Sequence, residues 1–145
     1  MTQLRILAID YGSARIGLAV SDPLCVIARD LETIPNDRRL WTRLKEILEG
    51  HEIGTIVVGM PLNLKGEMSH KAHEVEEFIR ELRTHTDRSV VVWDERFTTV
   101  IAQRQLQQMN ARRKHRRVQS GRVDRMAAAV ILQSYLDSRK PSASC

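Results

Sequence analysis

Several features that would point to particular classes of protein are scarce or absent in this 145-residue sequence. No apolar run approaches the roughly 20 residues that a membrane-spanning helix needs, and the first residues lack a secretory signal pattern. The two cysteines, Cys25 and Cys145, form no closely spaced metal or redox motif. Aromatic residues make up only 4% of the chain, so base stacking cannot be a widespread mode of binding. We therefore expect a reduced, cytoplasmic protein that does not interact with membranes.

The composition of the chain is ordinary for a soluble globular protein. Hydrophobic residues make up 42% and charged residues 28% of the sequence. The length suits one domain with a substantial core, and no internal repeat or low-complexity segment interrupts it. We expect a single domain over residues 1–138 and a flexible C-terminal tail over residues 139–145.

The positive charge of the chain is concentrated in one stretch. The formal net charge is +5. Residues 112–125 hold seven basic residues against the single acid Asp124, a local charge of +6 that leaves −1 for the rest of the chain. The basic residues are Arg112, Arg113, Lys114, Arg116, Arg117, Arg122 and Arg125. A solvated loop would show the same pattern, but such clustering is also typical of a surface that binds nucleic-acid phosphates.

The chain begins with a pattern that predicts a β-hairpin with a carboxylate at the end of its first strand. Residues 4–9 form an apolar run typical of a buried strand, Gly12 permits a turn, and residues 16–20 return beside the first strand. Asp10 directly follows the first run. It either caps the turn through its own backbone or faces an open cleft at the strand end.

The rest of the chain predicts alternating helices and strands. Alternation over residues 26–34 indicates a third meander strand, and Pro35-Asn36-Asp37 ends it before an amphipathic helix. Two buried strands are expected over residues 53–58 and 89–93, with a helix between them. A further helix is expected to begin at Thr98 or Thr99, and a last helix after Gly121. The expected core face of that last helix consists of Val123, Ala127, Val130, Ile131 and Ser134.

This element order defines a fold class. Right-handed crossovers place the fourth and fifth strands parallel to the first. We therefore predict an α/β fold with a five-stranded mixed sheet, made of three antiparallel meander strands and two parallel strands, with helices on both faces.

The predicted topology gathers acidic side chains at one edge of the sheet. Asp10, Gly59 and Glu95 all lie at carboxyl ends of parallel strands, and Asp124 opens the last helix near that edge. Asp124 also has a simpler explanation, since an acid favours the positive end of a helix dipole. Converging carboxylates repel one another unless a cation neutralises them, and oxygen ligands suit Mg²⁺ or Mn²⁺. Two such ions roughly 3.5–4 Å apart could support phosphodiester cleavage.

Four ordered motifs make a family resemblance specific. The segments AIDYGSARIGLAVSD, IVVGMPLN, DERFTT and GRVDRMAAAVILQSYL resemble the motifs of the YqgF family, also called RuvX, between about Leu4 and Leu136. Its members are RNase H-like proteins related to the RuvC Holliday-junction resolvases. The resemblance implies a bacterial, cytoplasmic, metal-dependent nuclease that matures the 5′ end of pre-16S ribosomal RNA. The acidic positions of the family fall on Asp10, Glu95 and Asp124.

Two positions depart from the pattern of related proteins. Many RNase H-like resolvases have an acid on the fourth strand, whereas here that strand runs into Gly59-Met60-Pro61. Asp94 is a neighbouring candidate, although strand alternation directs it away from Glu95. Before the final glycine, Gln119 and Ser120 stand where lysines are expected.

The remaining candidate site residues surround these acids. Gly12, Gly59 and Pro61 are expected to allow the substrate to approach. The residues expected to bind nucleic acid are Arg15, Arg96, Arg112, Arg113, Lys114, Arg116, Arg117 and Arg122.

Four functions remain open at this stage. The leading hypothesis is an endonuclease that cleaves structured RNA such as pre-rRNA, acting as a monomer or weak homodimer. The same site could resolve branched DNA, which would require paired active sites. A binding factor without catalysis, in transcription or ribosome assembly, would need only the basic stretch. The Asp-x-Gly hairpin also resembles the phosphate loop of actin-like ATPases, but those proteins need two such domains.

Overall fold

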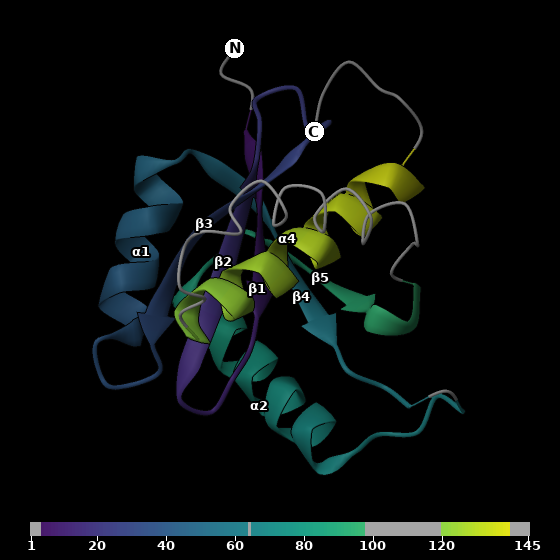
Figure 1. Cartoon of the computed structure of the whole chain (residues 1–145). Helices are drawn as coiled ribbons and strands as arrows, with labels where there is room; N and C mark the ends of the chain where they lie inside the picture. The colour runs from purple at the N-terminus through teal and green to yellow at the C-terminus, as the bar shows by residue number, and fades with distance from the viewer. Residues whose placement is uncertain (1–3, 64, 98–119, 140–145) are drawn as a thin grey trace.

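The computed structural model describes residues 4–63, 65–97 and 120–139 (Figure 1). The strands are β1 (Arg5–Asp10), β2 (Arg15–Ser21), β3 (Ala28–Pro35), β4 (Ile53–Met60) and β5 (Ser89–Asp94). The helices are α1 (Leu40–Gly50), α2 (His70–His85), the short 3₁₀ helix η1 (Glu95–Phe97) and α4 (Ser120–Ser138). The helix expected from Thr98 or Thr99 and most of the basic stretch lie outside the described residues.

The five strands form one mixed sheet in the order β3-β2-β1-β4-β5. β1 pairs antiparallel with β2, and β2 pairs antiparallel with β3. β4 runs parallel to β1 on one side and to β5 on the other. The predicted fold class is confirmed. No helix in the described part of the chain is long and apolar enough to cross a membrane.

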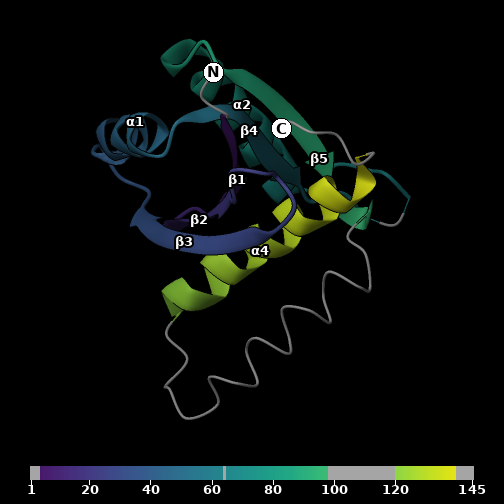
Figure 2. The same cartoon turned by 90° about the horizontal axis from the view of Figure 1, so that it is seen from above.

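Each face of the sheet is covered by its own helices. α1 and α2 pack on one face and α4 crosses the other (Figure 2). Because strand side chains alternate, Leu7 and Ile9 enter the core under α1 and α2, whereas Ile6 and Ala8 enter the core under α4. All four side chains are buried, and burying a large aliphatic side chain contributes about 1.5–3 kcal/mol. The side chain that follows Ala8 by two positions, Asp10, therefore lies on the α4 side of the sheet.

The third strand begins two residues later than the sequence pattern predicted. The carboxylate Oδ1 of Asp22 accepts hydrogen bonds from the backbone amides of Val26 and Ile27, each at 2.8 Å. These hydrogen bonds stabilise the loop after β2. The predicted start of the third strand at Val26 was therefore wrong. The strand starts at Ala28, whose amide donates to Gln133 Oε1 at 2.9 Å.

The core face predicted for the last helix was only partly right. Ile131 and Ser134 are buried as expected, but Ala127 and Val130 are partly exposed. Position 123 lies among the residues whose side chains are outside the described set. The helix instead buries a broad face of mostly small or apolar side chains, which are Met126, Ala128, Ala129, Ile131, Leu132, Gln133, Ser134 and Leu136. The small side chains of Ala128 and Ala129 pack closely on the sheet. The buried face is therefore broader than the narrow apolar stripe on which a sequence-based helix prediction depends.

Candidate active site

The ends of three parallel strands bring two of the predicted acids to either side of one glycine. Ile9 is the register partner of Val58, so Asp10 at the end of β1 lies beside Gly59. Gly59 in turn pairs with Trp93 on β5, and the chain reaches Glu95 two residues later. Asp10 and Glu95 therefore flank Gly59 at the carboxyl edge of the sheet.

The side chain of Glu95 reaches across the end of β4. A Cβ atom built on Gly59 would lie 2.8 Å from Glu95 Oε1 and 2.5 Å from Cδ1 of Ile131 on α4. Real Cβ atoms do not approach other atoms this closely, so a larger residue at position 59 would require the ends of the Glu95 and Ile131 side chains to move. The carboxylate of Glu95 thus occupies the space above the end of β4.

The environment of Glu95 disfavours its charged form. The side chain is half-buried, and this burial raises the pKa of the Glu95 carboxyl above its usual value. The positive charge of Lys71, in the first turn of α2, opposes the rise, and the negative charge of Asp94 adds to it. A nearby cation would stabilise the carboxylate, as expected for a metal ligand. The sequence patterns did not single out Lys71, because α2 follows a loop whose path they do not predict.

Asp94 is directed away from this site. Its carboxylate accepts hydrogen bonds from the backbone amide of Arg96 at 2.9 Å and from Arg96 Nε at 2.8 Å. Arg96 Nη2 also donates to Asp94 Oδ2 at 2.5 Å. These hydrogen bonds hold the pKa of the Asp94 carboxyl below its usual value. Asp94 is therefore engaged by Arg96.

The structure places the third predicted acid by its backbone alone. α4 begins at Ser120 and its first turn holds no acid, so Asp124 does not open the helix as predicted but follows its first turn; its side chain lies outside the described residues. Position 124 is four residues before Ala128 and seven before Ile131, so these three positions share one row of the helix. Ala128 is fully buried against the sheet and Ile131 contacts the end of β4. Position 124 thus lies on the row of α4 that faces the side of the sheet carrying Asp10 and Glu95.

The predicted nucleic-acid-binding residues are only partly described. Arg15 is exposed at the start of β2, and Arg96 is exposed at η1 with its guanidinium bound to Asp94. Arg96 also packs against the loop before α2, since its Nη1 lies 3.2 Å from a Cβ built on Gly66. The side chain of Arg122 is not described, and the other members lie outside the described residues: Arg112, Arg113, Lys114, Arg116 and Arg117.

Gly12 and Pro61, the two other residues expected to allow substrate approach, are also explained by the local backbone structure. A Cβ atom on Gly12 would collide with the backbone oxygen of Arg15, so the hairpin turn itself requires glycine. Pro61 directly follows the last residue of β4 and cannot donate a further ladder hydrogen bond. Both lie at the edge of the sheet that carries Asp10.

The donor set at this edge suits a hard divalent cation. Asp10 and Glu95 offer carboxylate oxygens, which Mg²⁺ and Mn²⁺ prefer, and a bound cation would offset the burial that raises the pKa of Glu95. In the described part of the chain, no three His, Cys, Asp or Glu side chains are grouped to hold a metal. A third acidic ligand would therefore have to be a side chain outside the described set, and Asp124 is the residue that the sequence predicts for this role.

The sheet order, the helices on both faces and the acidic edge define an RNase H-like fold of the resolvase type. RuvC of Thermus thermophilus, solved in complex with a Holliday junction substrate, matches with a TM-score of 0.60 and 15% identity over 92% of this chain and 95% of that one. The fowlpox virus resolvase, solved with Holliday junction DNA, matches with a TM-score of 0.53 and 12% identity over 93% and 98%. These similarities establish the fold.

The sequence itself establishes the family. The chain belongs to the RuvX family, whose model, described as "Holliday junction resolvase", matches residues 4–138. It is 43% identical over 141 residues to a protein of Geobacillus kaustophilus named "Putative pre-16S rRNA nuclease", covering 94% of this chain and 100% of that protein. A protein of the same name from Sulfurihydrogenibium is 39% identical over 135 residues, covering 92% and 90%. The chain is therefore a hydrolase of the nuclease class, acting on phosphodiester bonds.

Proposed function

We propose that this protein is a cytoplasmic, metal-dependent endonuclease that cleaves precursor 16S ribosomal RNA during maturation of its 5′ end. The observation that carries the proposal is the pair of carboxylates, Asp10 and Glu95, which follow the ends of β1 and β5 on either side of Gly59. The names of relatives about 40% identical over most of the chain support the RNA substrate.

Each acid has a defined part in this proposal. Asp10, Glu95 and Asp124 would hold Mg²⁺ or Mn²⁺, which when bound supplies a more acidic water and stabilises negative charge on the leaving oxygen. Gly59 leaves room for the Glu95 carboxylate above the end of β4, so that this carboxylate lies at the edge where a phosphodiester would bind. Lys71 and Arg96 border the edge and would contact neighbouring phosphates. The basic stretch at residues 112–122 would hold the RNA backbone.

The test is cleavage of a pre-16S leader transcript in the presence of Mg²⁺ or Mn²⁺. Wild type should cleave it, and Asp10→Asn and Glu95→Gln should lower the rate by at least roughly a hundredfold. Glu49→Gln, an exposed change on α1, serves as the matched control and should cleave at the wild-type rate. Equal activity of wild type and Asp10→Asn would overturn the assigned site. RNA binding without any metal-dependent cleavage would instead favour a binding factor.

A second candidate function is resolution of four-way DNA junctions. The fold similarity to RuvC and the description of the family model favour it. Both activities would use the same acids, so the substrate and the oligomeric state distinguish them. Symmetric cleavage of a four-way DNA substrate by a stable dimer would favour the resolvase. A monomer or weak homodimer that cleaves only the RNA leader would favour the ribosomal function.

A further inference from the structure

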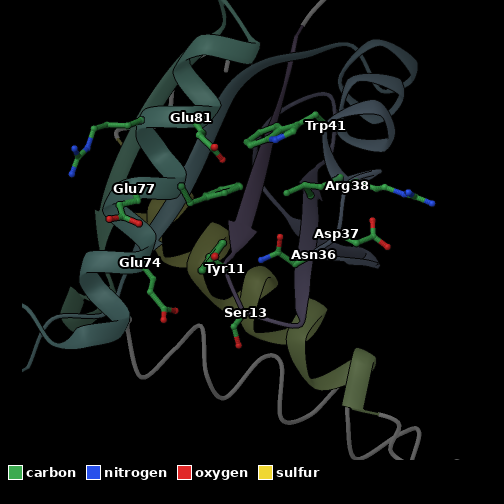
Figure 3. Close-up of a pocket in the computed structure, with 12 residues that line it drawn as sticks. Tyr11, Ser13, Asn36, Asp37, Arg38, Trp41, Glu74, Glu77 and Glu81 are labelled. Carbon is green, nitrogen blue, oxygen red and sulfur yellow. The ribbon is translucent and has the colours of Figure 1, made fainter.

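A second concave surface lies on the opposite face of the sheet from the acids. It is a cleft of about 780 Å³ between α1 and α2, open at the turn that follows β1 (Figure 3). Binding clefts commonly enclose roughly 300–1,000 Å³, so its size suits part of a ligand. Neither Asp10 nor Glu95 lines it, and the proposed nuclease function leaves it without a role.

The floor of the cleft is aromatic and fixed in place. Three of the six aromatic residues of the chain, Tyr11, Trp41 and Phe78, line it. Trp41 stacks on Phe78 with ring centroids 5.6 Å apart and on His85 at 4.1 Å, which ties α1 to α2. Tyr11 contacts Phe78 at 4.9 Å. In a chain so poor in aromatic residues, this concentration forms a preorganised apolar surface.

The rim of the cleft is acidic, in contrast to the chain as a whole. Four carboxylates line the cleft against two guanidinium groups, whereas the whole chain carries a net charge of +5. The acids are Asp37, Glu74, Glu77 and Glu81, and the bases are Arg38 and Arg80. Figure 3 shows Glu74, Glu77 and Glu81 along α2 and Asp37 on the opposite wall, with Tyr11 and Trp41 between.

Several charges on this rim are available to a ligand. Arg80 is bound to Glu76 at 3.0 Å and Glu74 to His70 at 3.1 Å. Among the described residues, neither Glu77 nor Glu81 has an ion-pair partner. Their carboxylates can therefore accept hydrogen bonds from a cationic ligand without breaking an existing pair.

These features select one class of ligand. The excess of carboxylates in this cleft favours a cationic ligand over a phosphate. In the described part of the chain, no three His, Cys, Asp or Glu side chains are grouped to hold a metal, so a bare metal ion is not the expected ligand. An arginine or lysine side chain offers a cationic head for the rim and an aliphatic stem for the aromatic floor. A peptide backbone would also find the Ser13 hydroxyl and the Asn36 carboxamide, which a polyamine could not use as fully.

We propose that the cleft between α1 and α2 binds an arginine- or lysine-bearing segment of a protein partner. One wall of the cleft is already held in position by Asn36. Its side-chain Nδ2 donates to the backbone oxygen of Gly12 at 2.9 Å, and its backbone N–H donates to the backbone oxygen of Ala14 at 3.0 Å. The proposal does not rest on the proposed nuclease function, because neither Asp10 nor Glu95 lines the cleft.

Fluorescence anisotropy with a labelled peptide tests the proposal. The probe is a short fluorescein-labelled peptide of alternating arginine, leucine and serine, and a citrulline-for-arginine version is the neutral control. The double variant Glu77→Gln/Glu81→Gln should weaken binding of the arginine peptide roughly tenfold, because two exposed ion pairs are lost. The matched double variant Glu49→Gln/Glu52→Gln removes the same charge from residues that do not line the cleft and should bind as wild type does.

Each outcome decides the question. No binding of the arginine peptide to wild type, equal binding of the citrulline peptide, or equal weakening by both double variants would overturn the proposal. Displacement of the peptide by spermine at equal or lower concentration would identify a polyamine site instead. Circular dichroism and the pre-16S cleavage assay should show both double variants folded and active, which separates loss of this site from loss of the nuclease site.

Discussion

Glu95 Oε1 lies 2.8 Å from the position that a Cβ atom on Gly59 would occupy. The carboxylate from the end of β5 thus lies over the end of β4, next to Asp10 at the end of β1. Near its end, β4 has Gly59 in place of an acid, and the acid after β5, Glu95, reaches over this glycine. A glycine on β4 gives Glu95 the room to reach the middle of the edge.

Replacing Gly59 with alanine should disrupt this arrangement. The added methyl group would force the ends of the Glu95 and Ile131 side chains to move, and because these ends are flexible the cost should be at the low end of overpacking, about 1 kcal/mol. We expect a lower free energy of unfolding and a loss of metal-dependent cleavage larger than the loss of stability explains. Urea denaturation and cleavage assays on the folded protein measure the two effects separately.

Gly50→Ala provides the matched control for that substitution. Gly50 ends α1, and a Cβ atom there would have no neighbour within 4 Å. Alanine costs less conformational entropy than glycine, so this variant should be neutral or slightly more stable, by up to about 0.5–1 kcal/mol. If Gly59→Ala were as harmless as Gly50→Ala, the close approach of Glu95 to β4 would be contradicted.

Glu95→Gln should stabilise the metal-free protein at neutral and alkaline pH. The pKa of Glu95 is raised in the folded state, so the folded protein binds this proton more tightly than the unfolded chain does. The stabilisation that protonated Glu95 provides is fully present below its unfolded pKa and is lost as pH rises through its folded pKa. Glutamine removes this titration, so the advantage of the variant should grow with pH across that window.

Thermal unfolding from acidic to alkaline pH in EDTA measures this difference. Glu49→Gln, on the exposed surface of α1, is the control for removing one carboxylate elsewhere. With Mg²⁺ or Mn²⁺ present the order should reverse, because the cation stabilises the carboxylate of wild type but not the amide. A variant that is less stable than wild type at alkaline pH without metal would contradict the assigned environment of Glu95.

The sequence carried enough information to predict the sheet but not the contact between Glu95 and Gly59. Apolar runs ending in Asp10 and Gly59 predicted two strand ends at one edge, and the structure has them in adjacent strands. Alternation predicted that Asp94 points away from Glu95; the structure shows its ion pair with Arg96, and its negative charge still acts on Glu95. Which side chain lies over Gly59 depends on the position of α4, and no local pattern encodes that.

The errors in the last helix and the third strand have related causes. Periodicity favoured Ala127 and Val130 for the core, but Ala128 and Ala129 are the fully buried positions because small side chains allow close helix-to-sheet contact. The start of β3 moved to Ala28 because a side chain, Asp22, binds the amides that the strand pattern had assigned to the ladder. Both are tertiary or side-chain effects that compete with local propensity.

Asp94→Asn should leave metal affinity unchanged. Asp94 is bound to Arg96 and is directed away from Glu95, so its charge does not belong to the ligand set. We expect a small loss of stability, about 0.5–1 kcal/mol, because the pair is partly exposed. Calorimetric titration with Mn²⁺ compares this variant with Asp10→Asn, which should lose most of its affinity. Equal losses in the two variants would make Asp94 a ligand and contradict its assigned direction.

Neutralising the basic stretch should make nucleic-acid binding less sensitive to salt. Each phosphate contact releases counterions, so the slope of log K against log salt should become shallower by about 1.5 in Arg116→Gln/Arg117→Gln. Arg125 would be a poor choice for this test, because its Nε already donates to Asp30 Oδ2 on β3 at 3.0 Å.

Arg39→Gln/Lys45→Gln removes two exposed charges on the α1 side of the sheet and is the matched control. Because these residues lie on the face opposite α4, they should not contact RNA held at the acidic edge, and the slope should stay at the wild-type value. Filter binding of the pre-16S leader across a salt series, in EDTA to prevent cleavage, measures both slopes. If both pairs changed the slope equally, net charge rather than a local phosphate-binding surface would explain RNA binding.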